Sequence, residues 1–166
     1  RVEAAEVEND HFSSLEYSIS NDSGETWSAR QPIQGLGRMH PSMATRPSDG
    51  LMVMSYVVRK GYPNTPEGKP QYGIEAVVSC DGGRTWDTEN RYLLARMTGP
   101  THVKHHITGE MLAYDPIFFA VQATSTIWLP ERKKFLTVFS TTHRATTAQK
   151  SLTPREIGFI EWEPLD

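Results

Sequence analysis

Apolar residues along the chain gather in short runs, most of them bounded by Gly, Pro, Asp or Asn. Runs of this length between turn residues are typical of β-strands. Residues 51–59 are the most apolar run, which predicts a strand buried on both faces. The pattern therefore predicts an all-β protein of antiparallel strands. The expected strands cover residues 15–19, 29–33, 42–45, 51–59, 72–79, 92–95, 125–128, 134–141 and 157–160.

Two of these runs lead into the same octapeptide pattern, Ser-x-Asp-x-Gly-x-Thr-Trp, at residues 20–27 and 79–86. An Asp side chain accepts hydrogen bonds from the backbone just after it, and Gly allows positive φ. The Ser and Thr hydroxyls close further local bonds. Each octapeptide is thus predicted to be a hairpin loop whose Trp plugs the core, burying roughly 150–250 Å². The matched residues are Ser20, Asp22, Gly24, Thr26 and Trp27, and Ser79, Asp81, Gly83, Thr85 and Trp86.

A calcium loop is the alternative reading of the octapeptide. Calcium loops need several carboxylates at alternating positions and a closing Glu. The shared pattern has one Asp and no such series. We therefore predict a structural role for both octapeptides, with no metal.

The octapeptide closely resembles the Asp box, or BNR repeat, of sialidase-like proteins, where it joins the third and fourth strands of a β-propeller blade. The resemblance implies antiparallel four-stranded blades, about 2.5 to 3 of a six-bladed propeller, in one partial domain over residues 1–166. The expected blades are a part at 14–35, a full blade at 38–95 and a third at 122–163, with an irregular insertion at 97–121. When Phe135 is aligned with Leu51, residues 135–140 match residues 51–59 in apolar character.

Composition narrows the range of partners. A net charge of −3 over 166 residues gives no basic field for nucleic acid. No apolar run approaches the ~20 residues of a membrane-spanning helix. A single cysteine, Cys80, excludes an internal disulfide. The chain starts at Arg1 and has room for about three blades, so we expect a part of a longer propeller, a homo-oligomer that completes a ring, or sheets that stack without closing.

The resemblance also implies a ligand site at the end of the sheets opposite the Asp boxes. Sialidases clamp the substrate carboxylate with three arginines, and guanidinium groups bind carboxylates bidentately. The crossing at residues 34–41 and the loops at 59–71 and 143–156 should supply the site. An acidic sugar or other glycan is the expected ligand, no cofactor is expected, and the family is extracellular or periplasmic. The candidate binding residues are Arg38, His40, Arg59, Glu67 and Arg144.

The catalytic residues stay unassigned. The sialidase acid/base is an Asp from the loop after the apolar strand, yet residues 60–71 contain no Asp and one carboxylate, Glu67. Tyr56, Tyr62 and Tyr114 have no recognisable partner Glu. The set His102, His105, His106 and Glu110 lacks metalloprotease spacing. Two hypotheses follow: a sialidase-like, glycan-processing exo-glycosidase whose missing groups lie elsewhere, or a non-catalytic propeller that binds glycan or protein.

Overall fold

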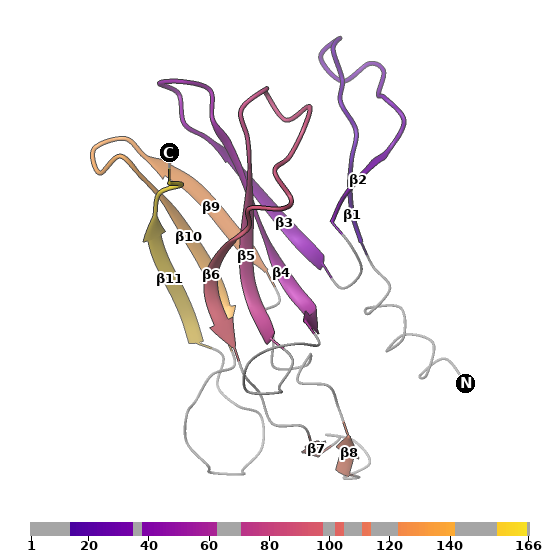
Figure 1. Cartoon of the computed structure of the whole chain (residues 1–166), viewed down its shortest axis with the longest axis vertical. Coiled ribbons are helices and arrows are strands. Elements are labelled where there is room, and N and C mark those ends of the chain that lie inside the picture. The colour runs from indigo at the N-terminus through magenta and orange to yellow at the C-terminus, as the bar shows by residue number, and fades with distance from the viewer. Residues whose placement is uncertain are drawn as a thin grey trace.

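The computed structural model describes residues 14–34, 38–62, 71–97, 102–104, 111–113, 123–141 and 156–165, and every regular element in them is a β-strand. The all-β prediction is confirmed at this level (Figure 1). None of these residues lies in a helix of the length and apolarity that a membrane crossing requires. The strands are β1 (Leu15–Tyr17), β2 (Gln31–Gln34), β3 (Arg38–Thr45), β4 (Met52–Tyr62), β5 (Gln71–Ser79), β6 (Tyr92–Met97), β7 (His102–Lys104), β8 (Met111–Ala113), β9 (Thr124–Leu129), β10 (Lys134–Thr141) and β11 (Glu156–Trp162).

The central sheet has four antiparallel strands in chain order, β3-β4-β5-β6. Its second strand is buried continuously from Val53 to Val58, as the apolar run predicts. Because side chains alternate along a strand, this run serves two cores on opposite faces of the sheet. One core joins Val53 and Val57 to the β9–β11 sheet, and the other joins Met54, Tyr56 and Val58 to the β1–β2 sheet.

Smaller sheets flank the central one. The pair β1-β2 covers one face, and the three-stranded sheet β11-β10-β9 covers the other (Figure 1). A third small sheet pairs β7 with β8, so the expected irregular insertion contains regular pairing. None of these sheets closes on itself. Both octapeptide loops lie at one end of the sheets, together with the β3–β4 and β9–β10 turns (Figure 1).

The β1–β2 hairpin repeats the β5–β6 hairpin when the two octapeptides are aligned. Strand β1 has a register shift between Leu15 and Glu16, and β5 has one between the equivalent residues Ile74 and Glu75. The bonds that close the two loops are also equivalent: the Ser28 amide donates to the Ile19 carbonyl and the Asp87 amide donates to the Val78 carbonyl, both at 2.8 Å. The first hairpin thus reproduces the third and fourth strands of the central sheet.

The β9–β11 sheet repeats the first three strands of the central sheet. Thr45 pairs with Met52 in the central sheet, and Trp128 pairs with Phe135 in the other. Met52 in turn pairs with Ser79, and Phe135 pairs with Trp162. With Phe135 placed on Met52, all of these pairs coincide. The alignment of Phe135 with Leu51, expected from apolar character, is therefore wrong, because a shift of one residue exchanges the two faces of a strand.

The repeats carry over to the faces that pack. Leu15 packs toward the central sheet, and its equivalent Ile74 packs toward the β9–β11 sheet. Ile127, Ile157 and Phe159 are exposed on the far face of that last sheet, at 51%, 78% and 70%. In the alignment of Phe135 with Met52, they match Ala44, Ile74 and Ala76, which lie in or against the core between the two sheets. The sheets thus follow one another as equivalent layers.

Hydroxyl groups lie in the middle of the interface between the central sheet and the β9–β11 sheet. Ser55 Oγ lies 2.6 Å from Thr126 Oγ1, which lies 2.9 Å from Thr137 Oγ1. The Trp162 Nε1 donates to that same Thr137 oxygen at 2.9 Å. Both threonines and Ser55 are buried, and they satisfy one another's hydrogen bonds. This chain of polar contacts links β4 to all three strands of the neighbouring sheet.

Candidate functional site

The two octapeptides, called Asp boxes here for the Asp that each contains, have the same internal hydrogen bonds. In the first, Ser20 Oγ donates to Asp22 Oδ1 at 2.7 Å, and the Gly24 amide donates to Ser20 Oγ at 2.7 Å. Asp22 also accepts from the Thr26 amide at 2.9 Å and from the Thr26 hydroxyl at 2.5 Å. The second box has the same four bonds at 2.8, 2.9, 2.9 and 2.6 Å. The predicted turn chemistry is confirmed in both.

These bonds favour the ionised Asp. The Thr26 hydroxyl, the Thr26 amide and the Ser20 hydroxyl together lower the pKa of Asp22 to about 2. The Thr85 hydroxyl, the Thr85 amide and the Ser79 hydroxyl do the same for the pKa of Asp81. Each carboxylate is therefore committed to its own loop. Within the described residues no group of three His, Cys, Asp or Glu side chains is placed to hold a metal ion.

The two tryptophans differ in burial. Trp86 is partly buried against the core of Met54, Tyr56 and Val77, as the core-plug interpretation predicts. Trp27 is 64% exposed, so that interpretation is wrong for the first box. Its indole folds back on its own loop, where Nε1 donates to the Gly24 carbonyl at 3.1 Å. The reason is the environment: residues 21–30 are all exposed, and no described strand covers them.

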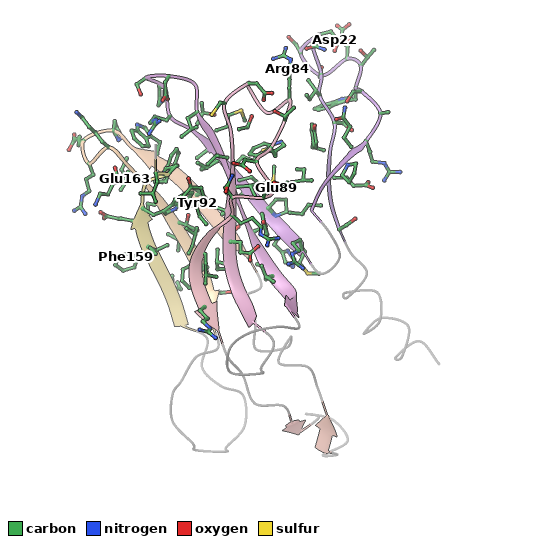
Figure 2. All side chains as sticks on the ribbon, in the orientation of Figure 1. Asp22, Arg84, Glu89, Tyr92, Phe159 and Glu163 are labelled. Carbon is green, nitrogen blue, oxygen red and sulfur yellow. The ribbon has the colours of Figure 1, made fainter. Side chains whose placement is uncertain are left out.

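The second box also contacts the preceding sheet. The Tyr17 hydroxyl of β1 donates to the Arg84 carbonyl at 2.6 Å, and Gln31 Oε1 lies 2.8 Å from the same hydroxyl. Arg84 and Asp22 lie at the same end of the molecule (Figure 2). Gly83 is buried beneath Met52 and Trp86: a Cβ there would lie 3.5 Å from the Met52 sulfur and 3.7 Å from Trp86 Cζ2. The loop is thus wedged between two sheets.

The opposite end of the central sheet carries the residues expected to bind the ligand. Arg38 begins β3 and pairs with Val58 of β4, next to Arg59. Residues 38–41 belong to β3, so the expectation that they form a crossing between sheets is wrong; ladder pairing with β4 extends the strand past the predicted start. The side chain of Arg59, and Glu67 and Arg144 entirely, lie outside the described residues.

The two candidate residues whose side chains are described, Arg38 and His40, differ in burial. Arg38 is 6% exposed and lies on the face of the sheet that meets β1–β2. His40 is exposed, with a φ of 54°. The register passes from Met39 opposite Val57 to Ser42 opposite Ser55, so β3 has one residue more than β4 at this point. This bulge turns His40 out of the ladder, and its carbonyl accepts a hydrogen bond from Thr124 Oγ1 at 2.9 Å.

A tyrosine and a glutamate that sequence patterns did not pair meet on the same face as Arg38. The Tyr56 hydroxyl donates to Glu75 Oε2 at 3.2 Å, and the two residues are 0% and 4% exposed. Register puts all three on one face, because Arg38 pairs with Val58, two residues after Tyr56, and Tyr56 pairs with Glu75. A charged residue inside an apolar strand was the signal available in the sequence. Their burial closes Tyr56 and Glu75 off from solvent, so this pair supports the sheet from within.

The remaining candidates are Cys80 and the set of three histidines with Glu110. Cys80 is an exposed free thiol at a variable position of the second box. His102 lies in β7 and its side chain is outside the described residues, as are His105, His106 and Glu110.

A scan against known protein families and a search of curated proteins find no match to this chain.

Proposed function

We propose that the stacked sheets are successive blades of a sialidase-like Asp-box β-propeller. The observation that carries the proposal is the repeat: β1–β2 matches the last two strands of the central sheet, and β9–β11 matches its first three, pair by pair. Equivalent faces meet at both interfaces. A series of equivalent four-stranded antiparallel layers is the building plan of a propeller.

The proposed activity is glycan processing of the exo-glycosidase type, with an acidic sugar held at the sheet end opposite the Asp boxes. His40 and Arg59 lie at that end on neighbouring strands, and Arg38 begins β3 at the same end but is buried. A guanidinium stays charged and suits a sugar carboxylate. By the same resemblance, the proposed setting is extracellular or periplasmic.

A second candidate function is binding of glycan without hydrolysis. It is favoured by the burial of Tyr56 and Glu75, which keeps that pair from reaching a bound sugar. The absence of Asp from residues 60–71 points the same way. Glycosidases of this kind need a placed acid and a nucleophile, so the two candidates differ in a measurable product.

Calorimetric titration with N-acetylneuraminic acid tests the binding site. Arg59→Ala and His40→Ala should abolish or greatly weaken binding at an unchanged melting temperature. Arg30→Ala is the matched control, because its side chain is 80% exposed and pairs with Glu16 of β1 rather than with the central sheet. Unchanged affinity in Arg59→Ala would reject the clamp. Release of fluorophore from an aryl α-sialoside then separates hydrolysis from binding alone.

A further inference from the structure

An apolar hollow of about 350 Å³ lies between β1 and the central sheet, on the side of the second Asp box. Residues 15–19 form one wall, and residues of β3 and β4 form the floor. Three methionines meet on this floor. Methionine side chains adapt to varied apolar partners. The floor residues are Pro41, Met43, Met52 and Met54, with Trp86 at the box end.

The repeat shows what fills the equivalent place at the other interface. By their strand pairing, Met43, Met52 and Met54 correspond to Thr126, Phe135 and Thr137. Those three are 4%, 0% and 0% exposed. Strand β4 covers them: Val53 and Val57 share a core with Phe135, and Ser55 bonds to Thr126. Met43, by contrast, is 57% exposed. The hollow over the central sheet therefore lies at the position that β4 occupies over the β9–β11 sheet.

On the same side, no strand among the described residues pairs with the edge of β1. Strand β5, its equivalent, pairs with β4 on one edge and β6 on the other. Among the residues the structure describes, β1 pairs with β2 alone. An unpaired edge presents backbone donors and acceptors to an incoming strand. The edge of β1 and the methionine floor thus together form a groove that can hold one β-strand.

We propose that this groove binds an extended strand of a partner polypeptide, antiparallel to β1, with apolar side chains at alternate positions. The β4–β5 pairing sets the register, since Val53, Ser55 and Val57 lie opposite Val78, Ala76 and Ile74. In β1, the residues equivalent to Val78, Ala76 and Ile74 of β5 are Ile19, Tyr17 and Leu15. The bound strand therefore places small or apolar side chains opposite these three β1 residues, over the methionine floor. Its side chains opposite Glu16 and Ser18 face away. The groove runs from Trp86 at the box end to Pro41, next to His40. This inference rests on the same sheet repeat as the proposed function, and peptide binding is measured separately from sugar binding.

A synthetic peptide that copies residues 52–58, Met-Val-Met-Ser-Tyr-Val-Val, with two lysines added for solubility, tests the groove on the full chain. We expect saturable binding by calorimetry and slower amide hydrogen exchange over residues 15–19. Met43→Lys should weaken binding about tenfold or more, which corresponds to about 1.4 kcal/mol. Ile157→Lys is the control, because Ile157 is an exposed apolar residue on another sheet. A peptide with lysine at the positions of Val53 and Val57 should not bind.

Three results would overturn the proposal. The peptide fails to bind a folded chain, or it binds Met43→Lys as tightly as the unmodified protein, which places it elsewhere. The third is a dimer by light scattering that Met43→Lys dissociates, because a second copy would then occupy the groove. Met43 is exposed, so Met43→Lys should keep the melting temperature of the unmodified chain and the comparison stays valid.

Discussion

Ser23 and Gly82 occupy the same position of the two Asp boxes and share a left-handed backbone, with φ of 60° and 72°. A residue with a Cβ is strained in this region, by roughly 1–2 kcal/mol. The following residues, Gly24 and Gly83, also have positive φ, at 95° and 82°. The loop therefore needs two consecutive left-handed residues, and the first box satisfies one of them with serine.

This relationship predicts opposite effects of exchanging the two residues. Gly82→Ser should lower the free energy of unfolding by about 1 kcal/mol, because a Cβ there meets only Arg84 Nη1 at 3.6 Å and the cost is that of the backbone. Ser23→Gly should raise it by a few tenths of a kcal/mol, since the relief of backbone strain is partly offset by the freedom that glycine gains in the unfolded chain. Urea denaturation measures both. Equal stability of Gly82→Ser and the unmodified protein would show that the loop relaxes.

The two box tryptophans should differ in their contribution to stability. Trp86→Ala removes a ring that packs against a core and is expected to cost about 3 kcal/mol, the low end for a large aromatic. Trp27→Ala removes an exposed ring and one hydrogen bond to the Gly24 carbonyl, so a loss below about 1 kcal/mol is expected. Thermal and urea unfolding of both variants check the contrast. Similar losses would contradict the burial difference.

The Asp boxes should make stability depend on acid pH. Asp22 and Asp81 have folded pKa values of about 2, below the ordinary value of 3.8 that applies to the unfolded chain. A lowered folded pKa contributes stability that is present above about pH 4 and is lost as pH falls toward about 2. The urea midpoint of the unmodified chain should fall across this window. In Asp22→Asn/Asp81→Asn the midpoint should be lower at pH 7 and fall less between about pH 4 and about pH 2.

Asp49 and Asp87 also have lowered pKa values, through hydrogen bonds from Arg46 and Asn90, so part of the acid dependence should persist in the double variant. Asp49→Asn in the unmodified background measures the part of the acid dependence that comes from Asp49. A double variant with the same acid slope as the unmodified protein would show that the boxes do not carry it.

The hydroxyl groups that link the two sheets predict that removal of one oxygen atom, that of Thr137, lowers the free energy of unfolding. Thr137→Val keeps the shape of the side chain but leaves the Trp162 Nε1 without its acceptor, which is expected to cost about 1–3 kcal/mol. Thr137→Ser keeps the oxygen and should retain most of the hydrogen-bond contribution. Urea denaturation of the pair isolates the polar contribution. A valine variant at least as stable as the serine variant would mean that apolar packing alone holds the interface.

The local geometry of the Asp boxes and the positions of most strands could be predicted from the sequence. The box bonds join close neighbours along the chain, such as Ser20 with Gly24 and Asp22 with Thr26, so their residue types suffice to specify them. Strand positions followed from runs of apolar residues between turn residues. Where pairing extended a strand, as in β3 at Arg38, a neighbouring strand supplied the hydrogen bonds.

Only the tertiary structure decided which residues meet. It separated Trp27 from Trp86, paired Tyr56 with Glu75, and showed that Phe135 is the equivalent of Met52 rather than Leu51. The octapeptides are the same at every matched position, yet one tryptophan is packed and the other is exposed. Local hydrogen bonds are satisfied by neighbours along the chain, whereas burial depends on which sheet packs alongside, and that is set by contacts between residues far apart in sequence.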